Sequence, residues 1–329
     1  MIPNALVIGC GSIGQRHIGN LKKFGIEVAG FDPREDRRRD TENKLEIRTH
    51  ADLASALRAR VSTVFVCSPT HLHAEHALMA ARAGSNLFIE KPISHTQDGL
   101  DELQAEVDRN RLHTLTACNF RFHPGLRKVK LLLEQGVIGK VTSIHVHFGQ
   151  YLPDWHPWED YRNGYSAQKA MGGGILLDRI HEIDYLRWLF GDIKEVHALA
   201  GKLGHLDIDV EDTVDALLRF HSGAFASVHL DYVRRTYTCS LDVTGESGTI
   251  LWAYEKQEVR WYTAADRVWH SMQWPGYDGN SMYLDQVKHF MDAIAGLERS
   301  EQDIHEARKA LDIALAIKKA ADEHRGVTI

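Results

Sequence analysis

Several features are scarce in this sequence of 329 residues, and each absence excludes a class of protein. The four cysteines lie far apart and form no CxxC pair, which argues against a disulfide framework or a zinc site and indicates a reducing cytosol. Basic residues number 39 against 45 acidic ones, so the chain lacks the basic balance of a dedicated nucleic-acid binder. No apolar run approaches the roughly 18 residues that a membrane span needs, and no internal repeat is present.

The N-terminus also lacks a targeting pattern. Residues 1–9 contain neither a basic segment nor a small-residue cleavage site, so we expect them to lead into the first strand rather than to form a signal peptide. The proportions of hydrophobic (43%) and charged (26%) residues exclude wholesale disorder. At about 100–200 residues per domain, the length suggests two domains.

Short apolar runs alternate with helical patterns in the first third of the chain. The apolar runs occupy residues 5–8, 26–31, 64–67, 86–89 and 114–117. The helical patterns between them occupy residues 13–24, 33–44, 71–83 and 96–109. This alternation predicts an α/β Rossmann domain over residues 1–120, with a doubly wound parallel sheet. Such a sheet binds its ligands at the carboxyl ends of its strands.

The rhythm changes in the remainder of the chain, where strand patterns follow one another. They occupy residues 141–148, 195–202, 213–220, 224–232, 238–244, 249–254 and 258–262, and helices are expected at 126–135, 174–190, 281–296 and 306–324. Hydrophobic and polar residues alternate within the strands, so one sheet face is buried and the other is polar. We predict a C-terminal α+β domain over residues 121–329 with a large, mostly antiparallel open sheet. The last helix is a candidate to pack back on the Rossmann domain.

A complete GxGxxG motif follows the first predicted strand and opens the first predicted helix. It consists of Gly9, Gly11 and Gly14, with Ser12 and Ile13 between the last two glycines. The glycines permit a tight turn and the close approach of a pyrophosphate, and the helix N-terminus offers free N–H groups to it. We predict a dinucleotide site; the alternative is an ordinary glycine turn that caps a helix.

An acidic residue stands where a dinucleotide site needs one. Asp32 ends the second predicted strand, 18 residues after Gly14, and an acid in this place accepts the ribose hydroxyls. The carboxylate favours NAD because it repels a 2′-phosphate. NADP stays possible because basic side chains that can hold a 2′-phosphate follow at Arg34, Arg37, Arg38 and Arg39.

Further segments resemble a known family. They are Ser-Pro-Thr-His-Leu-His at 68–73, Asn-Leu-Phe-Ile-Glu-Lys-Pro at 86–92 and the triple-glycine segment 172–184. With the N-terminal glycines, they resemble the Gfo/Idh/MocA oxidoreductases, the glucose–fructose oxidoreductase and inositol dehydrogenase family. The resemblance covers essentially the whole chain, including residues 119–122 and 245–248. It implies a Rossmann domain, a second α/β domain whose open sheet often forms a dimer face, and hydride transfer at a sugar or cyclitol hydroxyl.

The residues that would carry this chemistry are Lys91, Asp178 and His181. Removal of a hydroxyl proton needs a base, which His181 supplies with an ordinary pKa of about 6.5, and Lys91 ends a parallel strand where the nicotinamide should lie. The resemblance adds Asp178 to complete a Lys-Asp-His set, and it implies a cis bond before Pro92. Because Asp178 and His181 are three residues apart, we expect them on one helix face about 60° apart, with Asp184 a second candidate to orient the imidazole. The alternative for Lys91 is a surface lysine at a strand end, and the alternative for His181 is a histidine that makes a polar contact in the core.

The resemblance also implies the remaining contacts to the cofactor. They are Ser68, Pro69, Thr70, His73, Glu90, Lys91 and Asn119. His71, His73 and His76 invite a metal interpretation, but no carboxylate supports them on the same face, so we expect no metal.

An aromatic-rich segment precedes the triple glycine. Trp155, Tyr161 and Tyr165 offer platforms for a sugar ring, and Arg162 or Lys169 suits a carboxylate or a phosphate. The predicted substrate site combines these residues with Lys91, Asp178 and His181. The alternative is a Trp-rich packing or dimer loop.

These observations predict a cytoplasmic, NAD-dependent oxidoreductase. It would transfer a hydride between nicotinamide and a hydroxyl or keto carbon of a sugar, amino sugar, sugar acid, nucleotide sugar or cyclitol. The alternatives are an NADP-dependent ketosugar reductase and a non-catalytic dinucleotide-binding sensor or co-repressor, which would need no proton relay. We expect a homodimer or homotetramer through the C-terminal sheet, and no nucleic-acid or membrane partner.

Overall fold

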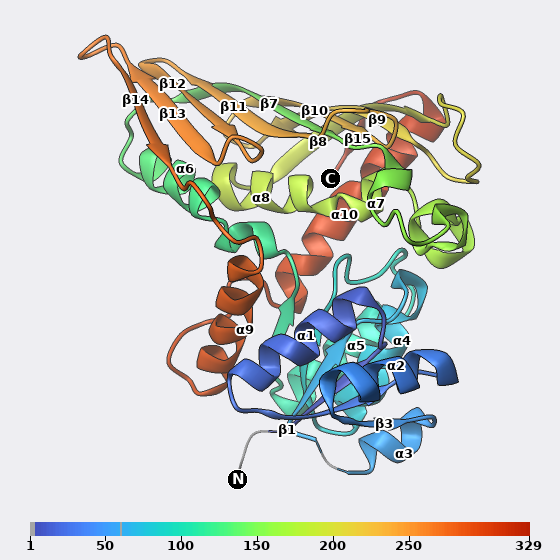
Figure 1. The fold of residues 1–329 in the computed structure, drawn as a ribbon. Coiled ribbons are helices and arrows are strands. Elements are labelled where there is room, and N and C mark those ends of the chain that lie inside the picture. The colour runs from blue at the N-terminus through green and yellow to red at the C-terminus, as the bar shows by residue number, and fades with distance from the viewer. Residues whose placement is uncertain (1–3, 60) are drawn as a thin grey trace. The chain divides into compact units, whose positions relative to one another are not determined.

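The computed structural model describes residues 4–59 and 61–329 (Figure 1). The expectation for the N-terminus is therefore followed from Asn4 on, since residues 1–3 lie outside the described part. The chain divides into two compact units. Unit 1 holds the chain up to Cys118 together with Asn280–Lys309, and unit 2 holds Asn119–Gly279 and Ala310–Ile329. The predicted second domain, residues 121–329, includes residues 280–309, which the structure places in unit 1.

Unit 1 is built around a six-stranded parallel sheet. Its strands are β1 (Asn4–Ile8), β2 (Glu27–Phe31), β3 (Arg48–His50), β4 (Thr63–Val66), β5 (Asn86–Ile89) and β6 (Thr114–Thr116). Their order is β3-β2-β1-β4-β5-β6, so the direction of winding reverses between β1 and β4. In doubly wound sheets the ligand binds at the carboxyl ends of the strands beside this reversal.

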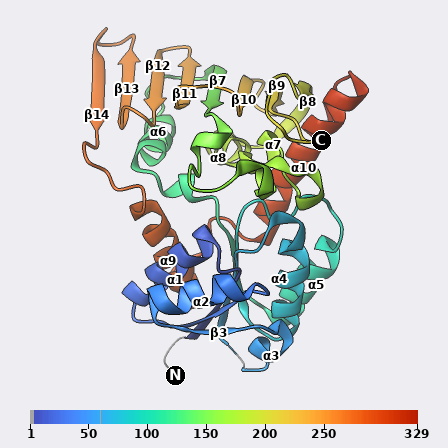
Figure 2. The ribbon, with the colours of Figure 1, turned by 45° about the vertical axis from the view of Figure 1, so that its right-hand side comes forward.

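Two groups of helices flank this sheet. The helices of unit 1 are α1 (Ser12–Lys23), α2 (Glu35–Leu45), α3 (Leu53–Leu57), α4 (His73–Arg82), α5 (Leu100–Asn110) and α9 (Ser281–Ile294). Helix α1 lies beside α2 and α9, and α4 lies beside α5 (Figure 2). Phe290 of α9 packs edge-on against the stacked rings of Phe65 and Phe88 in the core. This burial explains why the segment 280–309 belongs to unit 1.

Unit 2 is built around a nine-stranded sheet. Its strands are β7 (Val141–Gly149), β8 (Ile193–Gly201), β9 (Thr213–Phe220), β10 (Phe225–Asp231), β11 (Thr238–Gly245), β12 (Gly248–Ala253), β13 (Glu258–Thr263), β14 (Trp269–Gln273) and β15 (Val327–Thr328). Their order is β14-β13-β12-β11-β7-β10-β9-β8-β15. All neighbours run antiparallel except β7 and β10, which run parallel. The predicted fold class, a Rossmann domain followed by a mostly antiparallel sheet domain, is confirmed.

One face of this sheet is covered and the other is open. The helices α6 (Pro124–Glu134), α7 (Ile175–Asp178) and α8 (Ile180–Phe190) lie on the covered face (Figure 1). Alternate residues of β9 are buried against that side. The opposite face, which we call the open face, carries none of the described helices of unit 2 and exposes Leu199, Leu217 and Phe225. A last helix, α10 (Ile304–Glu323), contributes its first residues to unit 1 and the rest to unit 2.

The prediction of a single helix over residues 174–190 is wrong. Helix α7 ends at Asp178 and α8 begins at Ile180, because Arg179 between them has φ −103° and ψ 36°, outside the helical region. Asp178 and His181 are therefore not three residues apart on one regular helix, and the expected 60° separation does not apply. Among the described helices, none is long and apolar enough to cross a membrane.

Candidate functional site

In the turn between β1 and α1, the glycine that faces open space is Gly11. A Cβ on Gly9, whose φ is 100°, would lie 2.5 Å from the carbonyl oxygen of Cys67, and one on Gly14 would lie 1.8 Å from the oxygen of Gly9. A Cβ on Gly11 would meet the Arg37 guanidinium at 3.5 Å, an ordinary contact, and no nearer atom of the described residues. Packing within the protein thus requires Gly9 and Gly14. Packing does not require Gly11, and the open space beside it fits the close approach that a dinucleotide makes to this turn.

Helix α1 offers its N-terminus to the same space. Gly11 is the N-cap residue of this helix, and because it has no side chain, it makes no capping hydrogen bond to the first N–H groups. Backbone N–H groups in the first turn, which begins with Ser12 and Ile13, have no partner within a helix and suit an anion. The turn therefore fits the pyrophosphate of a dinucleotide.

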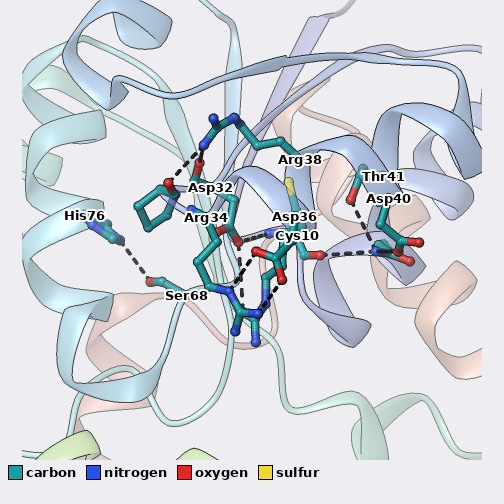
Figure 3. A network of polar contacts seen from close by, with 12 residues as sticks. Cys10, Asp32, Arg34, Asp36, Arg38, Asp40, Thr41, Ser68 and His76 are labelled. Carbon is teal, nitrogen blue, oxygen red and sulfur yellow. Dashed lines mark hydrogen bonds and ion pairs between the residues drawn. The ribbon is translucent and has the colours of Figure 1, made fainter.

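Asp32 is buried and held in place by backbone groups (Figure 3). Its Oδ2 accepts the N–H of Cys10 at 2.9 Å, and its Oδ1 accepts the N–H of Arg34 at 2.9 Å. Each carboxylate oxygen has a further lone pair for a ribose hydroxyl. The Arg37 guanidinium lies 4.0 Å from Oδ2, and Arg38 donates to the carbonyl oxygen of Asp32 at 2.8 Å. The carboxylate that favours NAD and the guanidinium groups that suit the 2′-phosphate of NADP therefore lie at the same strand end.

The loop after β4 is tied to the segment after β5 by His73. Its ring nitrogens lie 2.7 Å from the carbonyl oxygens of Ser68 and of Pro92, and His76 Nδ1 lies 2.9 Å from Ser68 Oγ. Burial lowers the pKa of His73, although both carbonyls favour the protonated ring. Since both ring nitrogens contact the protein, the imidazole positions this loop, which continues into the turn η1 (Thr70–Leu72). The predicted contact of His73 with a cofactor stays a prediction.

The Glu-Lys-Pro segment is anchored through its acid. Glu90 is buried, and its Oε1 lies 2.8 Å from Nε2 of His17. Burial raises the pKa of Glu90, but the hydrogen bond and charge of His17, with the charge of Lys91, outweigh it and leave the pKa below its ordinary value. Glu90 Oε2 also accepts the N–H of Lys91 at 3.2 Å. The bond between Lys91 and Pro92 is cis, as the resemblance implied. This arrangement fixes the backbone of Lys91 at the carboxyl end of β5.

In unit 2, Asp178 is buried at the centre of three hydroxyl groups. It accepts hydrogen bonds from Tyr165 Oη at 2.6 Å, Ser166 Oγ at 2.6 Å and Tyr232 Oη at 2.9 Å. Burial and the negative charge of Asp178 raise the pKa of Tyr232 well above its ordinary value, so this phenol stays a donor. Sequence analysis identified Tyr165 and Asp178 but missed Ser166 and Tyr232. Tyr232 lies 54 residues from Asp178, and no local pattern marks the pair.

His181 is buried in the first turn of α8. Its ring meets the edge of Phe120, with centroids 5.1 Å apart. Asp184, the second candidate to orient it, binds the buried Arg121 guanidinium through both carboxylate oxygens, at 2.9 and 2.7 Å. Asn119 begins the turn η2 (Asn119–Phe122), and its Oδ1 is buried with no hydrogen-bond partner among the described residues. This orphaned oxygen fits the predicted role of Asn119 in holding a ligand.

The aromatic-rich segment forms short 3₁₀ turns rather than a regular element. They are η3 (Leu152–Asp154), η4 (Tyr161–Asn163), η5 (Tyr165–Ala167) and η6 (Lys169–Met171). Trp155 donates to the carbonyl of Gln150 at 3.3 Å and packs edge-on against Phe148 and Tyr232. These contacts give Trp155 a packing role beside Tyr232.

The Arg162 side chain and the Lys169 backbone contact acids of their own unit. Arg162 binds both carboxylate oxygens of Asp160 at 2.6–3.1 Å and lies 3.9 Å from Asp207. The backbone N–H of Lys169 donates to Asp209 at 2.6 Å. Tyr161 Oη accepts the N–H of Asp207 at 3.1 Å. The positive charge of Arg162 is thus largely balanced within the protein.

The predicted residues therefore gather in two sets. The cofactor set of unit 1 lies at the carboxyl ends of β1, β2, β4 and β5, and it includes Lys91. In unit 2, Tyr165 and Asp178 are joined by a hydrogen bond, and His181 lies at the start of the next helix.

Two family profiles match the chain. One, described as an oxidoreductase family with an NAD-binding Rossmann fold, matches residues 4–116. The other, described as the GFO/IDH/MocA C-terminal domain, matches residues 126–251. Together they cover more than half of the chain, so the family predicted from the sequence is confirmed.

Relatives with named activities support the same assignment. Myo-inositol 2-dehydrogenase of Thermotoga maritima is 30% identical, over 98% of this chain and 97% of its own length. Inositol 2-dehydrogenase 3 of Saccharopolyspora erythraea is 32% identical, over 74% of this chain and 71% of its own. Among solved structures, levoglucosan dehydrogenase in complex with NADH and L-sorbose gives a TM-score of 0.90 at 22% identity, over 99% of this chain and 98% of that one. That structure shares the fold.

Proposed function

Because this chain belongs to the Gfo/Idh/MocA family of oxidoreductases, we propose that it transfers a hydride between a nicotinamide and a secondary alcohol carbon of a cyclitol or cyclic sugar. The observation that carries the proposal is the turn at Gly11, where the protein leaves open the space that a dinucleotide needs. The buried Asp32 at the neighbouring strand end supports NAD over NADP.

The proposed chemistry divides among three side chains. Bound NAD⁺ supplies the hydride acceptor. His181 takes the hydroxyl proton, and the Lys91 ammonium donates a hydrogen bond to the developing alkoxide. Asp178 holds Tyr165 and Ser166 in place for contact with the substrate. This division gives Asp178 a positioning role, because its carboxylate already accepts three hydroxyl protons.

The substrate is proposed to be uncharged. Arg162, the strongest candidate to hold a carboxylate or phosphate, is already bidentate on Asp160. A substrate anion would have to displace this pair. The hydroxyl groups around Asp178 suit a polyol, and similarity to the inositol dehydrogenases of Thermotoga maritima and Saccharopolyspora erythraea favours a cyclitol.

We also propose that two copies associate through the open face, in a dimer or a tetramer. Leu199, Leu217 and Phe225 are 70%, 60% and 53% exposed on the neighbouring strands β8, β9 and β10, and apolar side chains gathered in this way mark a protein–protein contact. A cytoplasmic location is proposed because all four cysteines are buried free thiols.

The test is a change in nicotinamide absorbance when the purified chain meets NAD⁺ and a panel of cyclitols, hexoses and anhydrosugars. Lys91→Ala is expected to lower turnover by roughly 10²–10⁴-fold, the usual contribution of a positioned proton-transfer group. NADH affinity should be retained, because the turn at Gly11 is untouched. Near-wild-type turnover by Lys91→Ala would remove Lys91 from the mechanism, and NADH binding without turnover on any substrate would favour the sensor alternative.

A further inference from the structure

A cluster of two histidines and two aspartates lies on the open face of the nine-stranded sheet, and the proposed hydride transfer does not use it. His147 of β7 pairs in register with His229 of the neighbouring β10. Val146 and Phe148 are buried against the covered face, as are Val228 and Leu230, so the histidines between them point to the other side. Their rings meet nearly perpendicularly, with centroids 5.0 Å apart.

We propose that this cluster binds one divalent transition-metal ion of the zinc type, with His147, His229 and Asp231 as its ligands. One ligand atom from each of the three residues lies within 4.8 Å of the others. Ligands of a tetrahedral zinc ion lie roughly 3.3 Å apart when Zn–N and Zn–O distances are about 2.1 Å, so small side-chain rotations close the site. Two imidazoles and a carboxylate are a common zinc donor set, with the fourth position left to water.

The hydrogen bonds around His229 prepare it as a ligand. Its Nδ1 lies 2.8 Å from Asp215 Oδ1, and a neutral ring that carries its proton on Nδ1 toward this carboxylate has its lone pair on Nε2. Nε2 faces Asp231 Oδ2 at 3.2 Å. A carboxylate that orients the far side of a metal-bound histidine is the usual outer shell of zinc sites. Asp215 has this position.

Asp231 is prepared in the same way. Its Oδ1 accepts the backbone N–H groups of Val233 and Arg234 at 2.9 and 2.6 Å, which fixes the carboxylate and leaves Oδ2 directed at His229. The Nε of Arg234 donates to Thr238 Oγ1 at 2.8 Å, and the positive charge of its guanidinium reaches His147. The carboxylates of Asp215 and Asp231 supply two negative charges, which a divalent ion needs beside the Arg234 guanidinium.

A second proton on His229 is the competing way to satisfy these contacts. An imidazolium would bridge Asp215 and Asp231, but it would leave His147 unexplained. Nε2 of His147 is shut off from solvent and has no hydrogen-bond partner among the described residues. A buried nitrogen of this kind costs free energy unless something binds it. A metal ion gives His147, His229 and Asp231 a common binding partner. A second proton on His229 accounts for the contact between His229 and Asp231 but leaves Nε2 of His147 without a partner among the described residues. The His229 side chain is 35% exposed in the single chain, so an ion has a route in before two copies associate through the open face.

The test titrates the full chain, after treatment with a chelator, with Zn²⁺ by calorimetry and with Co²⁺ by visible absorption. We expect one saturable site per chain and the d–d bands of tetrahedral Co²⁺. His229→Ala should abolish both signals. Asp215→Asn, which disturbs only the outer shell, should weaken zinc binding by roughly 10–100-fold.

His145→Ala is the matched control. His145 lies on the same strand and face but contacts Ser227 instead, and it is outside the cluster. This variant should bind zinc like the wild type. Equal binding by His229→Ala and the wild type, or equal loss in His145→Ala and His229→Ala, would overturn the proposal. A cooperative urea transition like that of the wild type confirms that each variant is folded, and His147→Gln replaces His229→Ala if the latter does not fold.

Discussion

Substitution of Gly11 by alanine should separate ligand binding from folding. The backbone of Gly11, with φ −75° and ψ −171°, is extended and open to any residue. The new methyl group would touch only the end of the flexible Arg37 side chain within the described residues. We therefore expect the free energy of unfolding without cofactor to stay within about 0.5 kcal/mol of wild type, or to rise by up to ~1 kcal/mol through a less flexible unfolded chain.

The loss should appear in cofactor affinity. The methyl group occupies the space in which a pyrophosphate approaches the backbone, and a hydrogen bond to a charged group contributes about 1.5–3 kcal/mol. At 1.4 kcal/mol per factor of ten, NADH should bind roughly 10–150-fold more weakly. Fluorescence titration with NADH measures the affinity, and urea denaturation measures the stability.

Two other glycines of the same segment provide controls. In Gly14→Ala the methyl would lie 1.8 Å from a backbone oxygen, so we expect a loss of about 3 kcal/mol or more in stability. A Cβ on Gly19, further along α1, would meet no atom of the described residues within 4 Å outside its own stretch of helix, so Gly19→Ala should leave NADH affinity unchanged. The reasoning is refuted if Gly11→Ala binds NADH normally, or if it destabilises the free protein as much as Gly14→Ala.

Three other predictions follow from single contacts. Asp32→Ala should weaken NADH about tenfold, and NADPH less, in parallel titrations; a wild type that already prefers NADPH would contradict this. Tyr165→Phe removes a hydrogen bond to buried Asp178 and should lower the free energy of unfolding by about 1.5–3 kcal/mol, whereas Tyr161→Phe should cost under ~1 kcal/mol. Burial lowers the pKa of His123 to about 4, so stability should be complete above about pH 6.5 and fall by roughly 3 kcal/mol as the pH drops towards 4. His123→Gln should flatten this slope in urea denaturation, and an unchanged slope would exclude His123 as its origin.

The parallel sheet of unit 1 could be predicted because its signals are local. Apolar runs, helical spacings and the glycine turn each lie within a few neighbouring residues. The place of α9 could not be predicted in this way. Its spacing predicts a helix, but the partner of Phe290 is a pair of phenylalanines some 200 residues earlier in the chain. Periodicity indicates which face of a helix is apolar and not which core that face joins.

The break at Arg179 illustrates the same limit within one segment. The sequence around it has good helical spacing, and nothing local interrupts the pattern. In the structure the Arg179 guanidinium lies 3.6 Å from the centre of the Phe148 ring and pairs with Glu182. Phe148 belongs to β7, so a contact with a distant strand accompanies the non-helical backbone of Arg179. The expected geometry of Asp178 and His181 failed because it assumed an uninterrupted helix.

The break also changes how Asp178 should be understood. A carboxylate offers about four acceptor positions, and three of those on Asp178 take hydroxyl groups from Tyr165, Ser166 and Tyr232. These donors come from the turn η5 and from Tyr232, which directly follows β10, so the acid joins the aromatic-rich segment to the sheet. A group that holds three protons of its own unit in place is poorly suited to receive a fourth from a substrate. In the mechanism that we propose, His181 therefore takes the proton, Lys91 donates a hydrogen bond to the alkoxide, and Asp178 fixes the hydroxyls that we expect to face the polyol.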